Sequence, residues 1–330
     1  MDKILTFSIA SYNIEKYIDK LMNSVLDERV LDKIEVLVVN DGSKDRTAEI
    51  AKDYEEKYPQ TVRLVDKENG GHGSTINRGI VEAKGKYFRA LDGDDWVDTE
   101  ALVETVARLE GTESDMIIMD YRTCYEAGGE ELEDFPMLED NKEYKFDDIA
   151  DKVQYIRYHS TIYKTEFLRK NNIRLDEHCF YVDSEYMLFS IPLVDTVAYF
   201  ALALYCYRIG IGEQSVSFEG RMKHIADSHK VAEKLLENYK NMPEEMSPAK
   251  RRYVTDGVAA HCTYHYNSLL IFKASKEKKK DIISFDKMLK EKYPEIYDRI
   301  TDMSILIKIM RKTNYMAYPL MPVYKKIRKV

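Results

Sequence analysis

The sequence predicts an α/β protein with a mostly parallel central sheet flanked by helices, followed by a C-terminal helical extension. Over the first 120 residues, short β-branched runs alternate with segments of helical apolar spacing. This alternation is typical of a parallel sheet that is covered on both faces. From about residue 219 onward, the apolar spacing is helical. The length of 330 residues fits one such domain and a smaller addition.

The elements of the first 120 residues follow from apolar runs and turn signals. Five strands are expected, each ending in polar or turn-forming residues: 3–10, 33–40, 62–65, 86–91 and 115–120. Helical spacing lies between them, over 14–26, 45–58, about 70–83 and a helix that starts near 99. Asp45, and either Asp98 or Thr99, are the predicted N-caps.

The rest of the chain is less regular at first and then helical. Residues 126–151 are acidic and contain Gly128, Gly129 and Pro136, which predicts a loop-like insertion. Short strand and helix signals return over 160–210, and helices are expected at 225–236, 253–272 and 282–289. The run Lys276–Lys280 is interpreted as a solvated connection. We therefore expect three regions: 1–120, 121–218 and 219–330.

Composition narrows the class of protein. Fifty basic and 58 acidic residues give a net charge of −8, which argues against nucleic acid as a partner. The four cysteines are far apart in the sequence and form no CxxC pair, so buried reduced thiols in a cytoplasmic protein are expected. The N-terminal apolar run is too short for a signal peptide, and no membrane-spanning helix is expected.

Three polar clusters follow predicted strands, at residues 11–13, 40–43 and 92–95. In parallel sheets, ligands bind beyond the carboxyl ends of the strands, so these clusters should meet at one edge. The turn Asp92-Gly93-Asp94-Asp95 offers carboxylates two residues apart, which can converge on a hard divalent cation. The alternative is that these aspartates only cap the following helix.

The segments Ser8–Asn13, Val38–Thr47 and Leu91–Trp96 occur in this order and together resemble family 2 inverting glycosyltransferases. The resemblance is strong over residues 3–120 and weaker over 160–215. It implies the GT-A nucleotide-diphospho-sugar transferase fold. It also implies transfer of a sugar from a nucleoside-diphosphate donor, with inversion at the anomeric carbon.

The resemblance carries a set of donor-binding residues: Ser11, Tyr12, Asn13, Asp41, Gly42, Ser43, Arg78 and Asp92. Tyr12 would stack on the nucleotide base, and Asp41 would accept a hydrogen bond from it. Asp92 would hold ribose or sugar hydroxyls. The alternatives are a tyrosine at the edge of the core for Tyr12 and a turn or cap residue for Asp41.

The same resemblance implies a cofactor, Mn²⁺ or Mg²⁺. Asp94 would ligate the ion where it bridges the diphosphate, with Asp92 nearby and Asp95 in support. The metal would neutralise charge that builds on the leaving nucleoside diphosphate. Trp96 is interpreted as a packing residue.

The glycine-rich segment departs from the family pattern. Ile76 occupies the position of the family's usual arginine, so Arg78 or His72 is expected to replace its phosphate contact. The loop Gly70-Gly71-His72-Gly73 opens a helix whose N-terminal amides can face an anion. A plain tight turn is the alternative.

Inverting transfer also requires a general base that deprotonates the acceptor hydroxyl. The family uses the aspartate of a Glu-Asp pair before a helix, and here Val182-Asp183 occupies that place. Asp183 is therefore the predicted base and Glu185 the second candidate. Capping of the helix is the structural alternative.

Downstream residues carry weaker signals. Arg208 would meet phosphate or form a surface ion pair, and residues 214–217 resemble a loop that closes such sites. His224 would assist the metal or acceptor, although lone histidines are usually structural. His261 and His265 are interpreted as packing or surface residues, because no glutamate follows His261 as HExxH requires.

Residues 305–330 contain no acidic residue and seven basic ones: Lys308, Arg311, Lys312, Lys325, Lys326, Arg328 and Lys329. Interleaved apolar residues make this segment suited to an anionic membrane surface. A terminal helix packed on the body is the alternative.

Taken together, the sequence predicts a metal-dependent inverting glycosyltransferase. It would use a UDP-sugar and a glycan or lipid-linked acceptor, in the cytoplasm or on the inner face of the cell membrane. A nucleotidyltransferase that makes nucleotide sugars and a catalytically idle glycan-binding subunit are the alternatives. The first would normally show a phosphate loop directly after the first strand, where this chain has Ala10-Ser11-Tyr12-Asn13.

Overall fold

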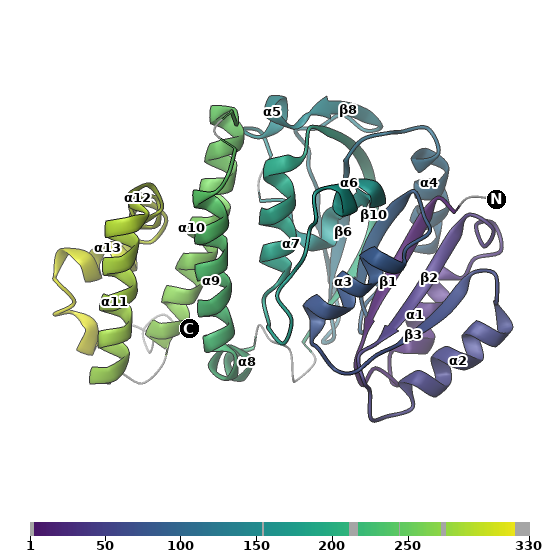
Figure 1. The fold of residues 1–330 in the computed structure, drawn as a ribbon, viewed down its shortest axis with the longest axis horizontal. Coiled ribbons are helices and arrows are strands. Elements are labelled where there is room, and N and C mark those ends of the chain that lie inside the picture. Colours follow the sequence, from purple (N-terminus) through teal and green to yellow (C-terminus); the bar gives the residue numbers. More distant parts are fainter. Residues whose placement is uncertain (1–2, 154, 211–216, 244, 272–274, 321–330) are drawn as a thin grey trace. The chain divides into compact units, whose positions relative to one another are not determined.

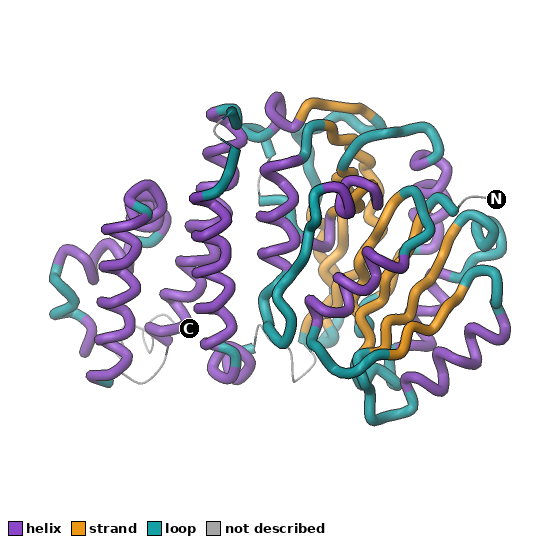
Figure 2. Tube along the Cα trace, viewed as in Figure 1, coloured by secondary structure: helices purple, strands orange, loops and turns teal. Residues whose placement is uncertain are grey.

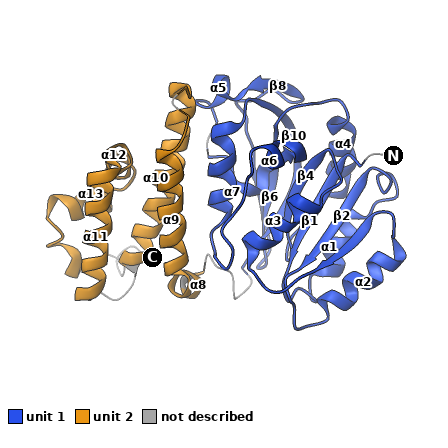
Figure 3. Ribbon diagram, viewed as in Figure 1, with its two compact units in different colours: residues 1–212 blue, residues 213–330 orange. Residues whose placement is uncertain are grey.

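A computed structural model describes residues 3–153, 155–210, 217–243, 245–271 and 275–320. The chain divides into two compact units, unit 1 (Met1–Gly212) and unit 2 (Glu213–Val330), shown in Figure 3. Unit 1 is built on a sheet, and the described part of unit 2 is helical, as Figure 2 shows. No helix among the described residues combines the length and the hydrophobicity needed to cross a bilayer.

The sheet of unit 1 has the strand order β3-β2-β1-β4-β9-β6-β10-β5, with β7 paired to β6 and β8 paired to β10. Figure 1 shows β1, β2 and β3 side by side in this sheet. The strands are β1 Leu5–Ser11, β2 Ile34–Asn40, β3 Val62–Asp66, β4 Tyr87–Asp92, β5 Trp96–Val97, β6 Met116–Tyr125, β7 Glu130–Glu133, β8 Lys142–Lys145, β9 Thr161–Lys164 and β10 Thr196–Ile209. The pairs β1–β2, β2–β3, β1–β4 and β6–β10 are parallel. This arrangement confirms the predicted α/β fold.

The helices of unit 1 are α1 Ile18–Val25, α2 Thr47–Lys57, α3 His72–Glu82, α4 Thr99–Leu109, α5 Phe146–Ile149, α6 Thr165–Lys170 and α7 Asp183–Ser190, with 3-10 turns η1 Tyr158–Ser160 and η2 Ile191–Leu193. One face of the sheet, including Leu5, Phe7 and Ile9 of β1, shares a buried apolar cluster with α1, α2 and α4. Helix α3 packs against the other face, very close to β1. A Cβ added to Gly79 of α3 would lie 1.9 Å from the Ser8 Oγ, so this approach requires glycine.

Strand β9 is the irregular part of the sheet. It runs antiparallel to both of its neighbours, β4 and β6. Its pairing with β4 covers two registered positions, of which Phe88 opposite Tyr163 is the last toward the carboxyl end of β4. Beyond Phe88, β4 therefore has a ladder partner on the β1 side and none from β9.

Several predicted boundaries change. The helix expected from residue 14 begins at Ile18, and α2 begins at Thr47, whose N–H donates to the Asp45 carboxylate at 3.0 Å. Asp98 caps α4 by accepting from the Ala101 N–H at 2.9 Å. The expected insertion at 126–151 contains β7, β8 and α5, because the edges of β6 and β10 recruit its polar residues into strand pairs.

Unit 2 contains α8 Phe218–Lys223, α9 Ile225–Lys240, α10 Pro248–Ile271, α11 Lys276–Lys292, α12 Pro294–Met303, α13 Ile305–Lys312 and the 3-10 turn η3 Tyr318–Leu320. The run Lys276–Lys280 is the start of α11, so its interpretation as a connection is wrong. The Ser275 side chain caps this helix by accepting from the Lys278 N–H at 3.1 Å. A strong N-cap thus offsets like charges that are otherwise unfavourable in one helical turn.

Candidate functional site

The acidic turn lies where the sheet prediction placed it, directly after β4. Asp92 is the last residue of this strand, and the Asp95 N–H donates to the Asp92 carbonyl at 3.1 Å. A Cβ at Gly93 would lie 2.7 Å from the Ala10 carbonyl oxygen, so glycine lets the turn pack tightly against the end of β1. The turn thereby holds three carboxylates at the ligand edge of the sheet.

Asp92 is surrounded by potential donors from distant segments. The His72 Nε2 lies 3.0 Å from an Asp92 carboxylate oxygen, and the Tyr158 hydroxyl donates to the same oxygen at 3.3 Å. Burial acts to raise the pKa of Asp92, but the charge and contact of His72 outweigh it and lower the pKa to about 2. Burial disfavours the imidazolium of His72 in turn, but Asp92 outweighs it and raises the His72 pKa. His72 and Asp92 therefore form an ion pair.

The other two carboxylates of the turn are less well compensated. Burial, followed by the charge of Asp92, raises the pKa of Asp94 to about 6. Burial and the charges of both neighbours raise the pKa of Asp95 well above its usual range. Asp95 accepts hydrogen bonds from the Tyr205 hydroxyl at 2.6 Å and from the Arg208 N–H at 2.7 Å. These raised pKa values show that the crowded carboxylates disfavour one another's charge.

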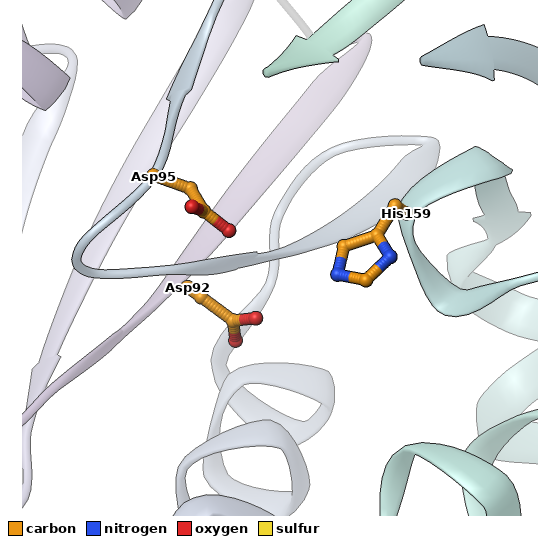
Figure 4. A group of neighbouring side chains, drawn as sticks. All are labelled: Asp92, Asp95 and His159. Carbon is orange, nitrogen blue, oxygen red and sulfur yellow. The ribbon is translucent and has the colours of Figure 1, made fainter. Parts of the chain in front are cut away.

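Within the described part of the chain, one group of three side chains brings possible metal-ligand atoms together. Asp92, Asp95 and His159 place one such atom each within 4.8 Å of one another, and Figure 4 shows the imidazole opposite the two carboxylates. Burial lowers the pKa of His159 to about 3, so the ring is neutral, as metal ligation requires. Its Nδ1 is buried and makes no hydrogen bond. Two carboxylates and a neutral imidazole fit Mn²⁺.

Aromatic rings and one arginine surround this group. The His159 ring stacks on Tyr207 with the centroids 4.0 Å apart and meets Tyr205 edge-on at 5.0 Å. Arg89 of β4 is 2% exposed and lies 4.7 Å from the centre of the Tyr205 ring. It donates hydrogen bonds to the carbonyl oxygens of Tyr158, His159 and Thr161.

Asp41 lies at the end of β2 and is 2% exposed. One of its carboxylate oxygens accepts from the Lys67 ammonium at 2.6 Å and from the Gly70 N–H at 2.8 Å. The other accepts from the Gly71 N–H at 2.8 Å. Asp41 thus fixes the glycine loop that begins α3, and this places His72 beside Asp92. Its contact with a nucleotide base stays a prediction.

The remaining predicted donor residues form one loop network beside β1. Tyr12 is 50% exposed, so much of its side chain is accessible to solvent. The Asn13 side chain accepts from the Lys44 N–H at 2.8 Å, and the Asn13 N–H donates to the Ser43 hydroxyl at 3.0 Å. Ser11 is buried, and its main-chain carbonyl accepts from the Asp41 N–H at 2.8 Å. Gly42 has φ of +72°, which favours glycine at this turn.

The two candidates for the general base differ in exposure. Asp183 begins α7 and is exposed, whereas Glu185 is fully buried. A Glu185 oxygen accepts from the Asp176 N–H at 2.8 Å and so holds the preceding loop. Neighbouring protein atoms raise the pKa of Asp183 by displacing water, although the charge of His72 opposes this effect. Of the two carboxylates only that of Asp183 is exposed, and its role as the general base stays a prediction.

Three further predicted residues have partners of their own. The Arg208 Nε donates to the Asp94 carbonyl at 2.8 Å, and its Nη1 lies 3.0 Å from the Glu126 carboxylate. Arg78 is exposed on α3 and pairs with Glu82 at 2.6 Å. His224 belongs to unit 2, where its Nδ1 lies 3.1 Å from Asp227. No contact of the described residues joins Arg78 to the Asp92 carboxylate, whereas His72 is beside it. The predicted loop residues 214–216 lie outside the described residues.

Comparison with known proteins identifies the family. Residues 6–172 match the family model described as glycosyl transferase family 2. The chain belongs to glycosyltransferase family 2. The matched region starts in β1 and includes the acidic turn, η1 with His159, and β9.

Among the relatives in this family, the glycosyltransferase EpsJ of Bacillus subtilis is 28% identical over 219 residues, which are 63% of this chain and 62% of EpsJ. The poly(ribitol-phosphate) β-N-acetylglucosaminyltransferase TarS of Staphylococcus aureus is 27% identical over 170 residues, which are 51% of this chain and 29% of TarS. The match thus spans less than two thirds of the length of each relative.

Solved structures support the fold. Residues 1–349 of S. aureus TarS, crystallised with UDP-GlcNAc, align with a TM-score of 0.70 and 18% identity, covering 99% of this chain and 92% of that one. A mannosyltransferase of Pyrobaculum calidifontis, in complex with GDP-Man and Mn²⁺, aligns with a TM-score of 0.51 and 14% identity, covering 99% and 88%. These likenesses confirm the GT-A fold with a helical extension.

Sequence reasoning missed four residues of the site: Arg89, Tyr158, His159 and Tyr205. Arg89 stands three residues before Asp92 in an otherwise apolar strand, which is a signal that was available. Tyr158 and His159 precede the short strand β9, and no spacing rule connects them to an acidic turn 60-odd positions earlier. Only the antiparallel insertion of β9 brings them there.

Proposed function

We propose that this protein is a metal-dependent inverting glycosyltransferase that uses a nucleoside-diphosphate sugar. The supporting observation is the convergence of Asp92, Asp95 and His159, with the ion-paired His72, at the carboxyl end of β4. Family membership and the fold shared with TarS, whose structure contains UDP-GlcNAc, support a UDP-sugar as donor.

In this proposal Asp92, Asp95 and His159 hold Mn²⁺ or Mg²⁺, with Asp94 beside them. The ion supplies positive charge that stabilises the departing diphosphate. Tyr12 offers its exposed ring to the nucleotide base, and the hydrogen bond from the Asn13 N–H to the Ser43 hydroxyl orders the neighbouring loop. His72, held by Asp92 at the start of α3, is the cation that takes the place of the family's arginine.

Asp183 accepts the proton of the acceptor hydroxyl as that oxygen attacks the anomeric carbon. An exposed carboxylate at the start of α7 can meet an acceptor, and its raised pKa strengthens it as a base near neutral pH. Glu185 keeps the second place, because it is buried and already holds the Asp176 N–H. The acceptor we propose is a hydroxyl of a glycan or a lipid-linked glycan.

The first experiment is a screen of nucleotide sugars with Mn²⁺ or Mg²⁺, which records thermal stabilisation and release of nucleoside diphosphate. We expect a UDP-sugar to give both signals only when a metal is present. Stabilisation and turnover that persist with EDTA would contradict metal dependence. Pyrophosphate release from a nucleoside triphosphate and a sugar phosphate would instead identify a nucleotidyltransferase.

The base is tested by Asp183→Asn beside Glu185→Gln. We expect Asp183→Asn to lower turnover by about 100-fold or more while UDP binding stays unchanged. Glu185→Gln should retain more activity, since the amide oxygen can still accept from the Asp176 N–H. Full turnover by Asp183→Asn would remove it from the mechanism.

We place the enzyme in the cytoplasm, on the inner face of the membrane when α13 binds lipid. Ile307 and Met310 of α13 are buried, and Arg311 pairs with Asp286 at 2.7 Å, so this face packs within unit 2. Apolar side chains remain exposed on the same segment: Ile305, Ile309, Met316 and Leu320. Exposed Lys308 and Lys312 accompany them. Residues 321–330, with four of the predicted basic residues, lie outside the described residues.

The lipid proposal is tested without disturbing the packed face. Lys308→Glu/Lys312→Glu should lose co-sedimentation with vesicles that contain phosphatidylserine and keep the unfolding temperature of the wild type. Lys287→Glu/Lys290→Glu on α11 is the matched charge change outside this segment. Equal sedimentation by all three proteins would contradict the role of α13.

A further inference from the structure

Arg89 lies on β4 directly after the point where the pairing between β4 and β9 ends. The β4–β9 ladder ends with Phe88 opposite Tyr163, while β9 continues to Thr161 beside β6. The residues Tyr158, His159 and Thr161 lie beyond the paired positions of β4 and β9. The guanidinium of Arg89 donates to all three.

The surroundings of Arg89 are unusual for a buried arginine. The side chain is 2% exposed, and its hydrogen-bond partners are carbonyl oxygens, with no carboxylate among them. One face of the guanidinium lies over the Tyr205 ring at 4.7 Å. The cost of burying an unpaired cation is several kcal/mol, so this arrangement requires compensation from nearby charge. Asp92, three residues along the chain, offsets part of this cost, although burial outweighs it and lowers the pKa of Arg89.

Arg89 therefore connects two layers of the site. Its main chain belongs to β4, which carries Asp92. Its side chain donates hydrogen bonds to main-chain carbonyls of the η1 segment, which carries His159. Tyr205, beneath its guanidinium, donates to Asp95 at 2.6 Å. All three members of the ligand group are thus within one or two contacts of this side chain.

We propose that Arg89 is a positioning residue for the metal site, which fixes the η1 main chain so that His159 meets Asp92 and Asp95. This inference rests on the proposed function. A guanidinium is suited to the task because its planar fork can hold several carbonyls at once, whereas a lysine ammonium is a single point charge. Groups that orient metal ligands in this way typically change metal affinity by about 10- to 100-fold when removed.

The experiment measures Mn²⁺ affinity by calorimetric titration, first alone and then with UDP, so that binding is read without turnover. The variants are Arg89→Lys, Arg89→Met, His159→Ala and the double variant Arg89→Met/His159→Ala. We expect the Mn²⁺ affinity to fall by about 10- to 100-fold in Arg89→Met. The loss should be smaller in Arg89→Lys, which keeps the charge. The lysine variant also tests the proposal if Arg89→Met fails to fold. The double variant should lose no more than His159→Ala alone, because Arg89 acts through His159.

Arg63→Lys is the matched control. Arg63 lies on β3 and is held by the carboxylates of Glu35 and Glu82, with no contact to η1. The Arg63→Lys variant should have a slightly lower unfolding temperature than the wild type and an unchanged Mn²⁺ affinity. At saturating Mn²⁺, Arg89→Lys should reach the kcat of the wild type, although it should need a higher Mn²⁺ concentration to do so. A merely structural role of Arg89 would not produce this result.

The outcomes separate this inference from the proposed function. Wild-type affinity for Mn²⁺ in both Arg89 variants, or independent losses that multiply in the double variant, would overturn the positioning role alone. A wild-type protein that binds no Mn²⁺ with or without UDP would overturn the proposed metal site and this inference with it.

Discussion

Two carboxylate sites at the same edge of the sheet have opposite surroundings. Asp41, after β2, accepts hydrogen bonds from one ammonium and two backbone amides, and all three donors lie in the segment of residues 67–71. The Asp92–Asp95 turn, after β4, holds three carboxylates near the ion-paired His72 and the Arg208 guanidinium, and burial and mutual repulsion still raise the pKa of Asp94 and Asp95. The first site is balanced in charge and the second is not.

The difference teaches which site is structural and which is prepared for a ligand. A balanced buried carboxylate stabilises the loop that holds it, since its hydrogen bonds are complete. Crowded carboxylates destabilise one another until a cation joins them. Removal of charge should therefore have opposite consequences at the two sites.

The largest effect is expected for Asp94→Asn in the acidic turn. Metal-dependent transfer should fall by about 100-fold or more, because a carboxylate beside the ion is lost. The unfolding temperature without metal should stay the same or rise, since like charges are relieved. The measurement is nucleoside diphosphate release against Mn²⁺ concentration, together with thermal unfolding in EDTA. A fall in stability without metal would show that the turn is balanced after all.

The reverse is expected for Asp41→Asn. The Lys67 ammonium and the amides of Gly70 and Gly71 would lose a charged acceptor, at a cost of about 3 kcal/mol in the free energy of unfolding. Urea unfolding measures this, and Asp53→Asn on the exposed face of α2 is the control, with an expected change within about 0.5 kcal/mol. Equal unfolding free energies for Asp41→Asn and Asp53→Asn would contradict the structural role.

The position of the acidic turn could be predicted because it depends on local signals. A β-branched run followed by Asp-Gly-Asp-Asp marks the end of a strand, and the parallel sheet then fixes the edge on which it lies. The same logic placed Tyr12 and Asp41 beside it. The family motifs then gave the class of fold, which the comparisons confirm.

The other half of the site could not be predicted from such signals. His159 reaches the turn through the antiparallel insertion of β9, which is a long-range pairing without a local signature. The internal hydrogen bonds of Asp41 also depend on tertiary packing against residues 67–71. The charged start of α11 was predicted to be a connection because runs of charged residues are common in solvated loops. In the structure the Ser275 side chain caps this segment, which favours a helix.

A smaller effect is expected for Gly79→Ala, which tests whether α3 couples the two sites. Helix α3 begins at the loop held by Asp41 and carries His72 to Asp92. Because a methyl group would overlap the Ser8 Oγ, the helix must shift at a cost of about 2 kcal/mol. We expect weaker Mn²⁺ binding together with lower stability. The double variant Ser8→Gly/Gly79→Ala should recover part of both, and recovery of neither would contradict the coupling.

Two histidines differ in a similar way, because their surroundings shift their pKa values in opposite directions. This difference gives the smallest predicted effect. Whereas Asp92 raises the pKa of His72, burial lowers the pKa of His261 in unit 2 to about 4. The folded state then binds fewer protons than the unfolded state between about pH 6.5 and pH 4, so stability falls as pH falls through that window. From pH 7 to pH 6 the contribution of His261 is less than about 1 kcal/mol.

Thermal unfolding across this pH range measures the effect. His261→Gln should unfold with a weaker dependence on pH than the wild type, since its side chain does not titrate. His178→Gln, at an exposed histidine of unit 1, is the control and should keep the wild-type dependence. Identical pH profiles for His261→Gln and the wild type would contradict the burial argument.

The insertion of β9 also has a consequence for how the chain is synthesised. β4 ends at Asp92, whereas its partner β9 begins only at Thr161, so the growing chain carries an unpaired strand edge over a long stretch of translation. Open edges recruit other strands and promote aggregation. A chain shortened to residue 120 would keep that edge permanently. We expect it to aggregate where a chain that includes β9 and β10 stays monomeric.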